Sequence, residues 1–145
     1  MRLEPLYRLT FTYPEEFGWD VVGEGGTQSQ FFFLAEGRVE GRISGRFHGA
    51  NHPQRRTDGT FVPDFQGVIE TDDGATIYAD THGFGRAYPV GRRQIVVATT
   101  HVADDERYRW LNDVLCVGVG EVRTGDDGVV LVTEVAELVW EPIAD

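Results

Sequence analysis

Apolar and polar side chains alternate along most of this chain, which is the pattern of β-strands with one buried face. Between Leu3 and Tyr13 the odd positions are apolar, and Leu6 is the exception among the even ones. From Arg38 to Gly49 the alternation is stricter, and glycine recurs on the apolar side at every fourth position. Such spacing predicts one strongly bent strand, a device by which sheets close on themselves.

The same alternation, together with β-branched and aromatic residues, predicts six further strands. The segment Asp104–Asn112 alone has the composition of a short helix or helical turn. Many strands with one helical turn predict an all-β fold, a single antiparallel β-barrel of about eight or more strands over residues 1–145. The further strands are expected at Gln30–Ala35, Phe65–Thr71, Ala75–Thr81, Gln94–Ala103, Val114–Val122 and Val129–Trp140.

The segment Asp64–Gly83 has the composition of a β-hairpin, because two β-rich runs flank Thr71-Asp72-Asp73-Gly74. Asp-Gly supplies the positive φ angles that tight hairpin turns require. The runs 57–59 and 124–128 have similar turn chemistry, and none of these clusters has the ligand spacing of a twelve-residue calcium loop. Longer loops are expected at Pro14–Gly26 and Ala50–Pro63.

Composition and charge narrow the class of partner. The chain has 145 residues, 41% of them hydrophobic, which suits one domain with one core. Its net charge of −11 opposes binding to nucleic acid and to anionic membrane surfaces. No segment has the length and apolarity of a membrane span or the pattern of a signal peptide, so we expect a cytoplasmic protein. Cys116 lies in an apolar run and is expected to be a buried, inert thiol.

Four short sequence motifs occur in an order that is typical of one bacterial family. They are Leu3–Thr10, Gly37–Gly41, Glu70–Tyr78, and Tyr108–Asn112 followed by Cys116–Gly120. Together they resemble the domain-of-unknown-function 3237 family over nearly the whole chain. The resemblance implies a compact barrel, lipocalin-like or allene-oxide-cyclase-like, that self-associates as a dimer or higher homo-oligomer and encloses a small-molecule cavity.

Two segments differ from the motifs that are usual in this family. His48-Gly-Ala-Asn-His52 places Asn51 where relatives tend to have an acidic residue and His52 where they have an aromatic one. Relatives favour an aromatic-aromatic-Arg-Thr motif at the position of Val96-Val-Ala-Thr99. This chain has the threonine of that motif but neither its arginine nor its aromatic residues. If these positions line the cavity, it is larger and less cationic in this protein, and a relative's ligand does not transfer to it.

The histidines are the first candidates for chemistry. His48, His52, His82 and His101 come from different predicted strands or their ends, and a barrel can bring such positions to one mouth. A near-neutral pKa suits proton transfer or ligand hydrogen bonding, and solvated loop histidines are the alternative. Glycines and Pro53 oppose a helical pairing of His48 with His52, so any metal site would need ligands from other strands, and none is predicted.

The predicted hairpin supplies a second group, in which Glu70, Tyr78 and His82 could converge. A carboxylate buried against aromatics can abstract a proton beside a carbonyl, while a phenol or imidazole holds the oxyanion. The alternative is that Glu70 pairs outside the barrel with an arginine of the 38–46 strand face.

Aromatic residues near the predicted loops are candidates for cavity walls, although core filling would explain them equally well. No nucleophilic triad, phosphate loop or dinucleotide fingerprint is found, so no cofactor is expected. We expect a barrel that encloses a small apolar organic molecule, either as a cofactor-free isomerase, cyclase or lyase or as a carrier; a protein-docking barrel is a third possibility. The candidate catalytic residues are His52, Glu70, Tyr78, His82 and His101, and the candidate ligand-binding residues are Trp19, Tyr88, Thr99 and Trp110.

Overall fold

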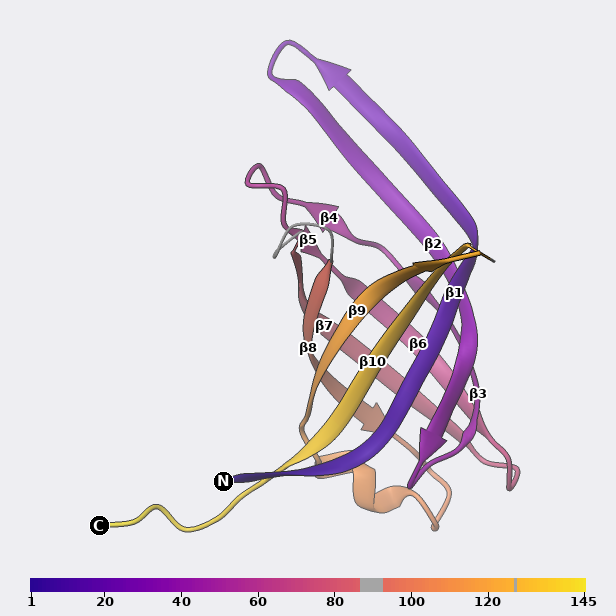
Figure 1. The fold of residues 1–145 in the computed structure, drawn as a ribbon, viewed down its shortest axis with the longest axis vertical. Coiled ribbons are helices and arrows are strands. Elements are labelled where there is room, and N and C mark those ends of the chain that lie inside the picture. The colour runs from indigo at the N-terminus through magenta and orange to yellow at the C-terminus, as the bar shows by residue number, and fades with distance from the viewer. Residues whose placement is uncertain (87–92, 127) are drawn as a thin grey trace.

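The structure, a computed structural model, describes residues 1–86, 93–126 and 128–145. Antiparallel strands dominate it, and one 3₁₀ helix interrupts them (Figure 1). The elements are β1 (Arg2–Gly23), β2 (Gly26–Gly41), β3 (Gly45–Asn51), β4 (Gln54–Arg55), β5 (Phe61–Val62), β6 (Asp64–Thr71), β7 (Thr76–Arg86), β8 (Gln94–Val102), the 3₁₀ helix η1 (Arg109–Asp113), β9 (Cys116–Gly125) and β10 (Gly128–Val139).

Eight of the strands close into a ring in the order β1-β2-β3-β6-β7-β8-β9-β10, and the ring closes where β10 pairs with β1. Neighbouring strands are antiparallel throughout, and the short strands β4 and β5 extend the sheet beside β7. The predicted antiparallel barrel of about eight strands is therefore confirmed.

The alternation in the sequence corresponds to the two sides of this ring. Tyr7, Phe11, Phe47, Phe65 and Ile69 point inward and are buried. Glu134 and Arg8, which are paired across β1 and β10, form an ion pair on the outside. From Tyr7 to Tyr13 the odd-numbered positions of β1 thus face the interior, as the pattern predicts. Nearer the N-terminus a register shift between Pro5 and Tyr7 leaves Leu3 exposed and buries Leu6.

The predicted 64–83 hairpin is formed by β6 and β7, with Ile69 opposite Ile77. Its turn places Gly74 at φ 93°, which a residue with a side chain rarely adopts. The Thr71 hydroxyl accepts a hydrogen bond from the backbone N–H of Ala75 at 2.8 Å and so holds the turn closed.

The prediction of one bent strand from Arg38 to Gly49 is wrong, because a tight turn divides this segment into the end of β2 and the start of β3. The glycines face neighbouring backbone: a Cβ at Gly45 would lie 2.2 Å from the carbonyl oxygen of Glu70, and one at Gly49 would lie 2.4 Å from that of Gln66. Their spacing reflects the close approach of adjacent strands and not the bending of a single strand.

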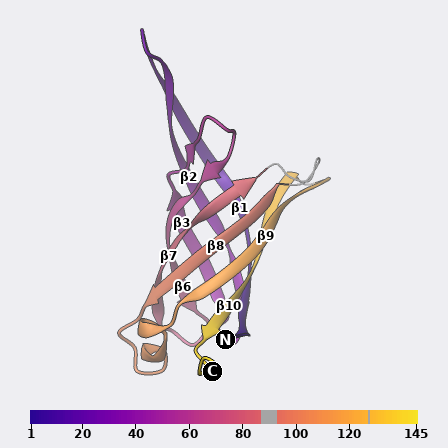
Figure 2. The same cartoon turned by 90° about the vertical axis from the view of Figure 1, so that its left-hand side faces the viewer.

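The prediction of a loop at Pro14–Gly26 is also wrong, since β1 and β2 remain paired as far as Gly23 and Gly26. The ends of these strands project from the ring as a two-stranded arm, residues 17–32 (Figures 1 and 2). Trp19, Val21 and Val22 favour extended backbone, and the turn forms only at the glycines that follow them. Trp19 and Val21 are exposed on the arm, and Phe17 stacks on Trp19 with ring centroids 6.2 Å apart.

Helix η1 lies across the end of the ring opposite the arm (Figure 2). Its Leu111 is fully buried and packs into the core beside Leu6, Ile43 and Cys116. Cys116 is a free thiol with no exposed surface, and burial raises its pKa to about 11, so it stays protonated as expected. The ring is therefore closed at this end.

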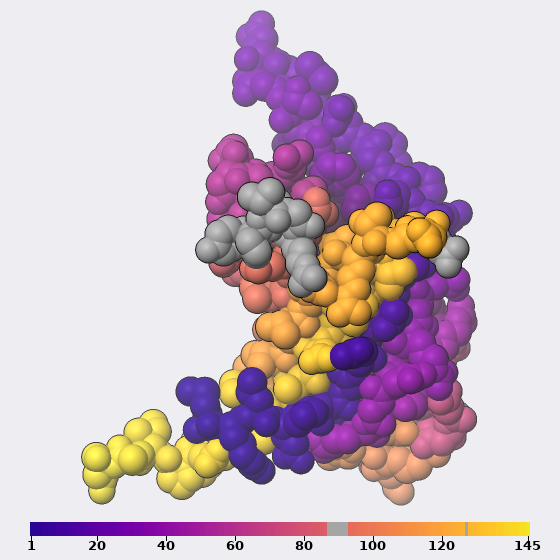
Figure 3. Space-filling model, viewed as in Figure 1, coloured from indigo at the N-terminus to yellow at the C-terminus, as the bar shows by residue number. Residues whose placement is uncertain are grey.

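The space-filling view in Figure 3 shows the arm and the C-terminal tail standing clear of the barrel body. Among the described residues, no helix has the length and apolarity needed to cross a membrane.

Candidate functional site: a cavity inside the barrel

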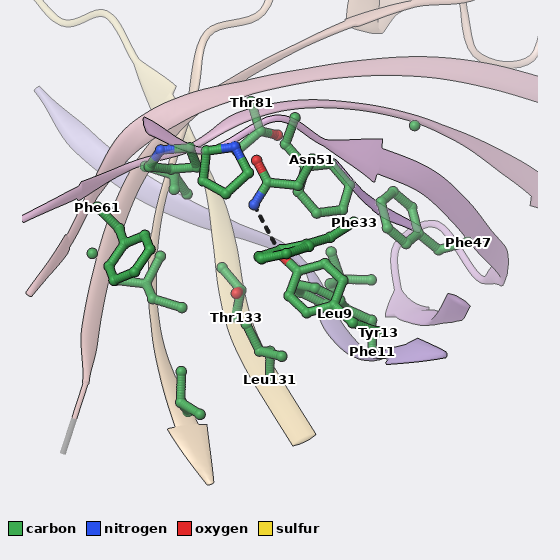
Figure 4. Close-up of a pocket in the computed structure, with 18 of the residues that line it drawn as sticks. Leu9, Phe11, Tyr13, Phe33, Phe47, Asn51, Phe61, Thr81, Leu131 and Thr133 are labelled. Atoms are coloured by element: carbon green, nitrogen blue, oxygen red, sulfur yellow. Dashed lines mark hydrogen bonds between the residues drawn. The ribbon is translucent and has the colours of Figure 1, made fainter. Parts of the chain in front are cut away.

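A cavity of about 320 Å³ occupies the interior of the ring (Figure 4). It extends from Tyr7 and Val135, near the η1 end, to Glu16 and Arg93 at the arm end. Apolar side chains form most of its wall, and six of them are phenylalanines, so the cavity suits a flat apolar molecule. The phenylalanines are Phe11, Phe31, Phe33, Phe47, Phe61 and Phe65.

Tyr13 and Asn51 place a polar pair in this apolar wall. The Asn51 amide nitrogen donates to the Tyr13 hydroxyl oxygen at 2.9 Å (Figure 4). The Asn51 amide oxygen accepts from the backbone N–H of Asp64 at 3.1 Å. Because the backbone contact fixes the orientation of the amide, the phenol oxygen acts as an acceptor. Its own hydrogen remains available to a ligand.

The environment of Tyr13 keeps the phenol neutral. Burial raises its pKa to about 12, although the Asn51 hydrogen bond opposes this shift. The negative charge of Glu16 raises the pKa further, and the Arg93 cation lowers it. At neutral pH Tyr13 is therefore a hydrogen-bond donor and not a base.

A second phenol lies near the closed end. Tyr7 lines the cavity, and its hydroxyl oxygen lies 2.8 Å from Nε2 of His101. His101 is 1% exposed, and burial lowers its pKa to about 4, so the ring is neutral at physiological pH. Burial likewise raises the pKa of Tyr7 well above its usual value.

Threonine hydroxyls supply the remaining polar groups of the wall. The hydroxyls of Thr81 and Thr99 lie 2.9 Å apart on the paired strands β7 and β8, and both residues line the cavity. One hydroxyl donates to the other, which leaves one hydrogen free. Thr133 adds a further hydroxyl from β10. Of the predicted ligand-binding residues, Thr99 thus lies in the cavity wall.

The predicted group Glu70, Tyr78 and His82 lies on the outer face of the ring. Their strand neighbours Ile69, Ile77 and Thr81 face inward, so period-two alternation points all three side chains to solvent. Arg46 donates to Glu70 at 3.0 Å, which is the alternative pairing considered for this carboxylate. The sequence grouped these residues on one face correctly, but that face is not the cavity side.

Other predicted site residues are also outside the cavity. Trp19 is on the projecting arm, and Trp110 is on η1 beneath the Arg42 guanidinium. Tyr88 lies outside the described residues. The four histidines do not meet at one mouth: His48 and His82 are on the outer face, and His52 packs its ring against Phe32. Among the four, His101 contacts a cavity residue.

Among the described residues, Asp64, Asp80 and His82 form a group whose possible metal-ligand atoms lie within 4.8 Å of one another. All three are on the outer face. The Gln66 amide nitrogen donates to both carboxylates, at 2.7 and 2.9 Å, so their oxygens are already held by hydrogen bonds within the protein.

Sequence reasoning left Tyr7, Tyr13, Glu16 and Arg93 out of the candidate site. The alternation in the first strand had already put Tyr7 and Tyr13 on its apolar side, and a tyrosine in such a row brings a hydroxyl into the interior. Glu16 was not selected because its segment, Pro14–Gly26, was expected to be a loop. Asn51 differs from the residue that relatives tend to have at its position, which the sequence shows. Its hydrogen bond with Tyr13 follows only from the tertiary structure.

Solved structures of similar fold come from several organisms. A β-barrel-like protein from Acinetobacter baumannii AYE has a TM-score of 0.74 at 22% identity, with 94% of each chain covered. A conserved protein of unknown function from Rhodopseudomonas palustris has a TM-score of 0.78 at 19% identity, over 95% of this chain and 97% of the other. An enzyme from Penicillium herquei has a TM-score of 0.63 at 23% identity, over 92% and 93%. At such identities the likeness shows the fold.

No curated protein matches the chain. The family model described as a protein of unknown function, DUF3237, matches residues 1–136. The resemblance carried by the four sequence motifs therefore extends over nearly the full length, and the chain belongs to the DUF3237 family.

Proposed function

We propose that this protein binds a small apolar carbonyl compound inside the barrel and catalyses a cofactor-free proton transfer on it, as an isomerase does. The observation that carries the proposal is the Tyr13 hydroxyl, which Asn51 orients as a donor in a wall made largely of apolar side chains. A hydrogen-bond donor fixed in an apolar site binds an oxyanion better than the parent carbonyl, because the charge develops where water is excluded.

Glu16 is the candidate base. It lines the arm end of the same cavity that Tyr13 lines, so a ligand in the cavity can contact both groups. The Glu16 carboxylate takes a proton from the carbon next to the carbonyl. The electron pair of that C–H bond forms a C=C bond, and the π pair of the C=O bond moves onto the carbonyl oxygen. Tyr13 donates to the resulting enolate oxygen. When the substrate has a C=C bond next to the deprotonated carbon, the enolate is a dienolate, and return of the proton to its far carbon moves the double bond and completes an isomerisation.

The proposal can be tested with β-tetralone, an apolar ketone with acidic α-hydrogens. Proton NMR in heavy water measures how fast these hydrogens are replaced by deuterium. The wild-type protein is expected to accelerate the exchange, because the exposed Glu16 acid exchanges its proton with solvent. Tyr13→Phe should lower the accelerated rate about 10- to 100-fold, and Glu16→Gln about 100-fold.

Each variant has a matched control at a position on the outer face of the barrel. Tyr78→Phe removes a hydroxyl from an outward-facing tyrosine, and Glu15→Gln changes the neighbour of Glu16 that faces the outside. Both should exchange β-tetralone at the wild-type rate. If wild type binds the ketone by calorimetry but leaves its exchange unchanged, the protein is a carrier and the catalytic part of the proposal is wrong.

We also propose that the protein forms homo-oligomers through the arm. A two-stranded hairpin is marginally stable in water without a packing partner. The arm carries the apolar side chains of Phe17, Trp19, Val21 and Val22, which are 43 to 76% exposed in the single chain. A second copy packed on the arm would bury this surface.

A further inference from the structure

Tyr7 and Tyr13 stand on the same inward-facing row of β1, with Leu9 and Phe11 between them. Six residues of extended strand span about 20 Å. The cavity therefore has one phenol near its closed end and a second phenol six residues farther along β1 toward the arm end, with an apolar stretch between the two. The function proposed above uses one of these phenols, and the inference that follows rests on that function.

His101 determines which hydrogen-bonding role Tyr7 plays. Its Nδ1 is buried without a partner among the described residues, so one ring nitrogen makes a hydrogen bond and the other makes none. If Tyr7 donated to Nε2, the neutral ring would carry its hydrogen on the unpartnered Nδ1. In the other tautomer Nε2–H donates to the Tyr7 oxygen, and the donor left over is the Tyr7 hydroxyl. That hydroxyl belongs to a residue of the cavity wall, where a ligand can accept its hydrogen, whereas Nδ1 is buried with no acceptor among the described residues. A buried donor left without an acceptor is costly, so the contacts favour the tautomer in which Nε2–H donates to the Tyr7 oxygen.

The Tyr7 hydroxyl hydrogen then has no acceptor among the described side chains. Tyr7 is in the same situation as Tyr13, whose oxygen accepts from the Asn51 amide. We propose that His101 and Asn51 are positioning residues that turn Tyr7 and Tyr13 into two donors facing one apolar cavity. The ligand class is a rod-shaped apolar molecule with an acceptor oxygen at each end.

The charges in the wall indicate what kind of oxygen each end accepts. Arg93 and Glu16, the charged groups among the described lining residues, are both at the arm end. At the Tyr7 end the neighbours are Val135, Thr133 and neutral His101. An anion buried at the closed end would have no counterion, so the oxygen that Tyr7 binds is a neutral carbonyl.

Nitrogen-15 NMR of the unliganded protein tests the tautomer directly. The ring-nitrogen shifts and couplings of His101 report which nitrogen carries the hydrogen at neutral pH. A proton on Nε2 is expected. A proton on Nδ1 would make Tyr7 the donor to histidine and would overturn the inference.

Calorimetry with three matched probes tests the ligand class: trans-stilbene, trans-stilbene with one terminal aldehyde, and trans-stilbene with an aldehyde at each end. One extra hydrogen bond is expected to make the dialdehyde bind about three- to tenfold more tightly than the monoaldehyde. Tyr7→Phe should abolish this difference and leave monoaldehyde binding unchanged, because Tyr13 still binds the single carbonyl.

Tyr78→Phe serves again as the control and should keep the full preference for the dialdehyde. Equal affinities of the wild type for both aldehydes, or an equal loss for all three probes in Tyr7→Phe, would contradict the role given to Tyr7. Binding of the probes with no dialdehyde preference would leave the cavity proposal standing. Absence of binding for all three probes, with no exchange of β-tetralone, would instead remove the proposed function itself.

Discussion

At the residue scale, burial has made His101 a neutral group. Its pKa is lowered from 6.5 to about 4 by desolvation. Between these two values the unfolded chain binds a proton that the folded protein does not bind. The free energy of unfolding therefore falls as the pH drops from 6.5 toward 4, and the contribution of His101 is fully present above pH 6.5.

His101→Gln removes this titration and should flatten the pH dependence. Between pH 6.5 and 5 the wild type is expected to lose about 1.5 kcal/mol more unfolding free energy than the variant, because the slope reaches about 1.4 kcal/mol per pH unit only where the unfolded histidine is fully protonated. Urea unfolding at several pH values measures the difference. His48, His52 and His82 are present in both proteins and cancel. Parallel curves for the two proteins would mean that His101 binds its proton equally well in the folded and unfolded chains, which would contradict the lowered pKa.

Single residues also show where sequence reasoning was sufficient. Thr99 and His101 were selected from the sequence and lie in the wall or directly behind it. Glu70, Tyr78 and His82 were selected from the same kind of pattern and lie outside. Alternation identifies which residues share a face, but it does not say which face is buried when both carry polar and apolar residues.

At the scale of elements, the short helix η1 decides that the cavity has a closed end. Leu111 is 0% exposed and fills the space between strands at this end. Leu111→Ala should cost about 3 kcal/mol of unfolding free energy, since the removed side chain leaves a void. Leu115→Ala, at a position 46% exposed four residues later, is the control and should cost less than about 1 kcal/mol.

The arm is the element whose structure differs most from the sequence prediction, since a loop was expected there. The joint substitution Trp19→Ser and Val21→Ser removes apolar surface that the proposed homo-oligomer needs, without touching the ring. Light scattering should show an oligomer for the wild type and a smaller particle for the variant. Arg123→Ser, at an exposed position of β9, is a control that should leave the mass unchanged. A wild-type monomer would remove the proposal.

At the scale of the whole molecule, the barrel depends on one long-range pairing, that of β1 with β10. A chain ending at Trp140 loses an exposed tail and should unfold at the wild-type temperature. A chain ending at Val130 loses the buried residues Leu131, Thr133 and Val135, and both neighbouring strands lose their partner. We expect it to lack a cooperative thermal transition by circular dichroism, and a cooperative transition would show that the open sheet folds.

The sequence by itself determined the family, the all-β class, most strands and the 64–83 hairpin, because these follow from local alternation, turn residues and recognisable phrases. Only the tertiary structure decided that Arg38–Gly49 is two strands, that β1 and β2 extend into an arm, and that Tyr7 and Tyr13 are the phenols of a cavity. The physical reason is that strand pairing and the choice of buried face depend on contacts between residues distant in the chain, such as Tyr7 with His101 and Tyr13 with Asn51.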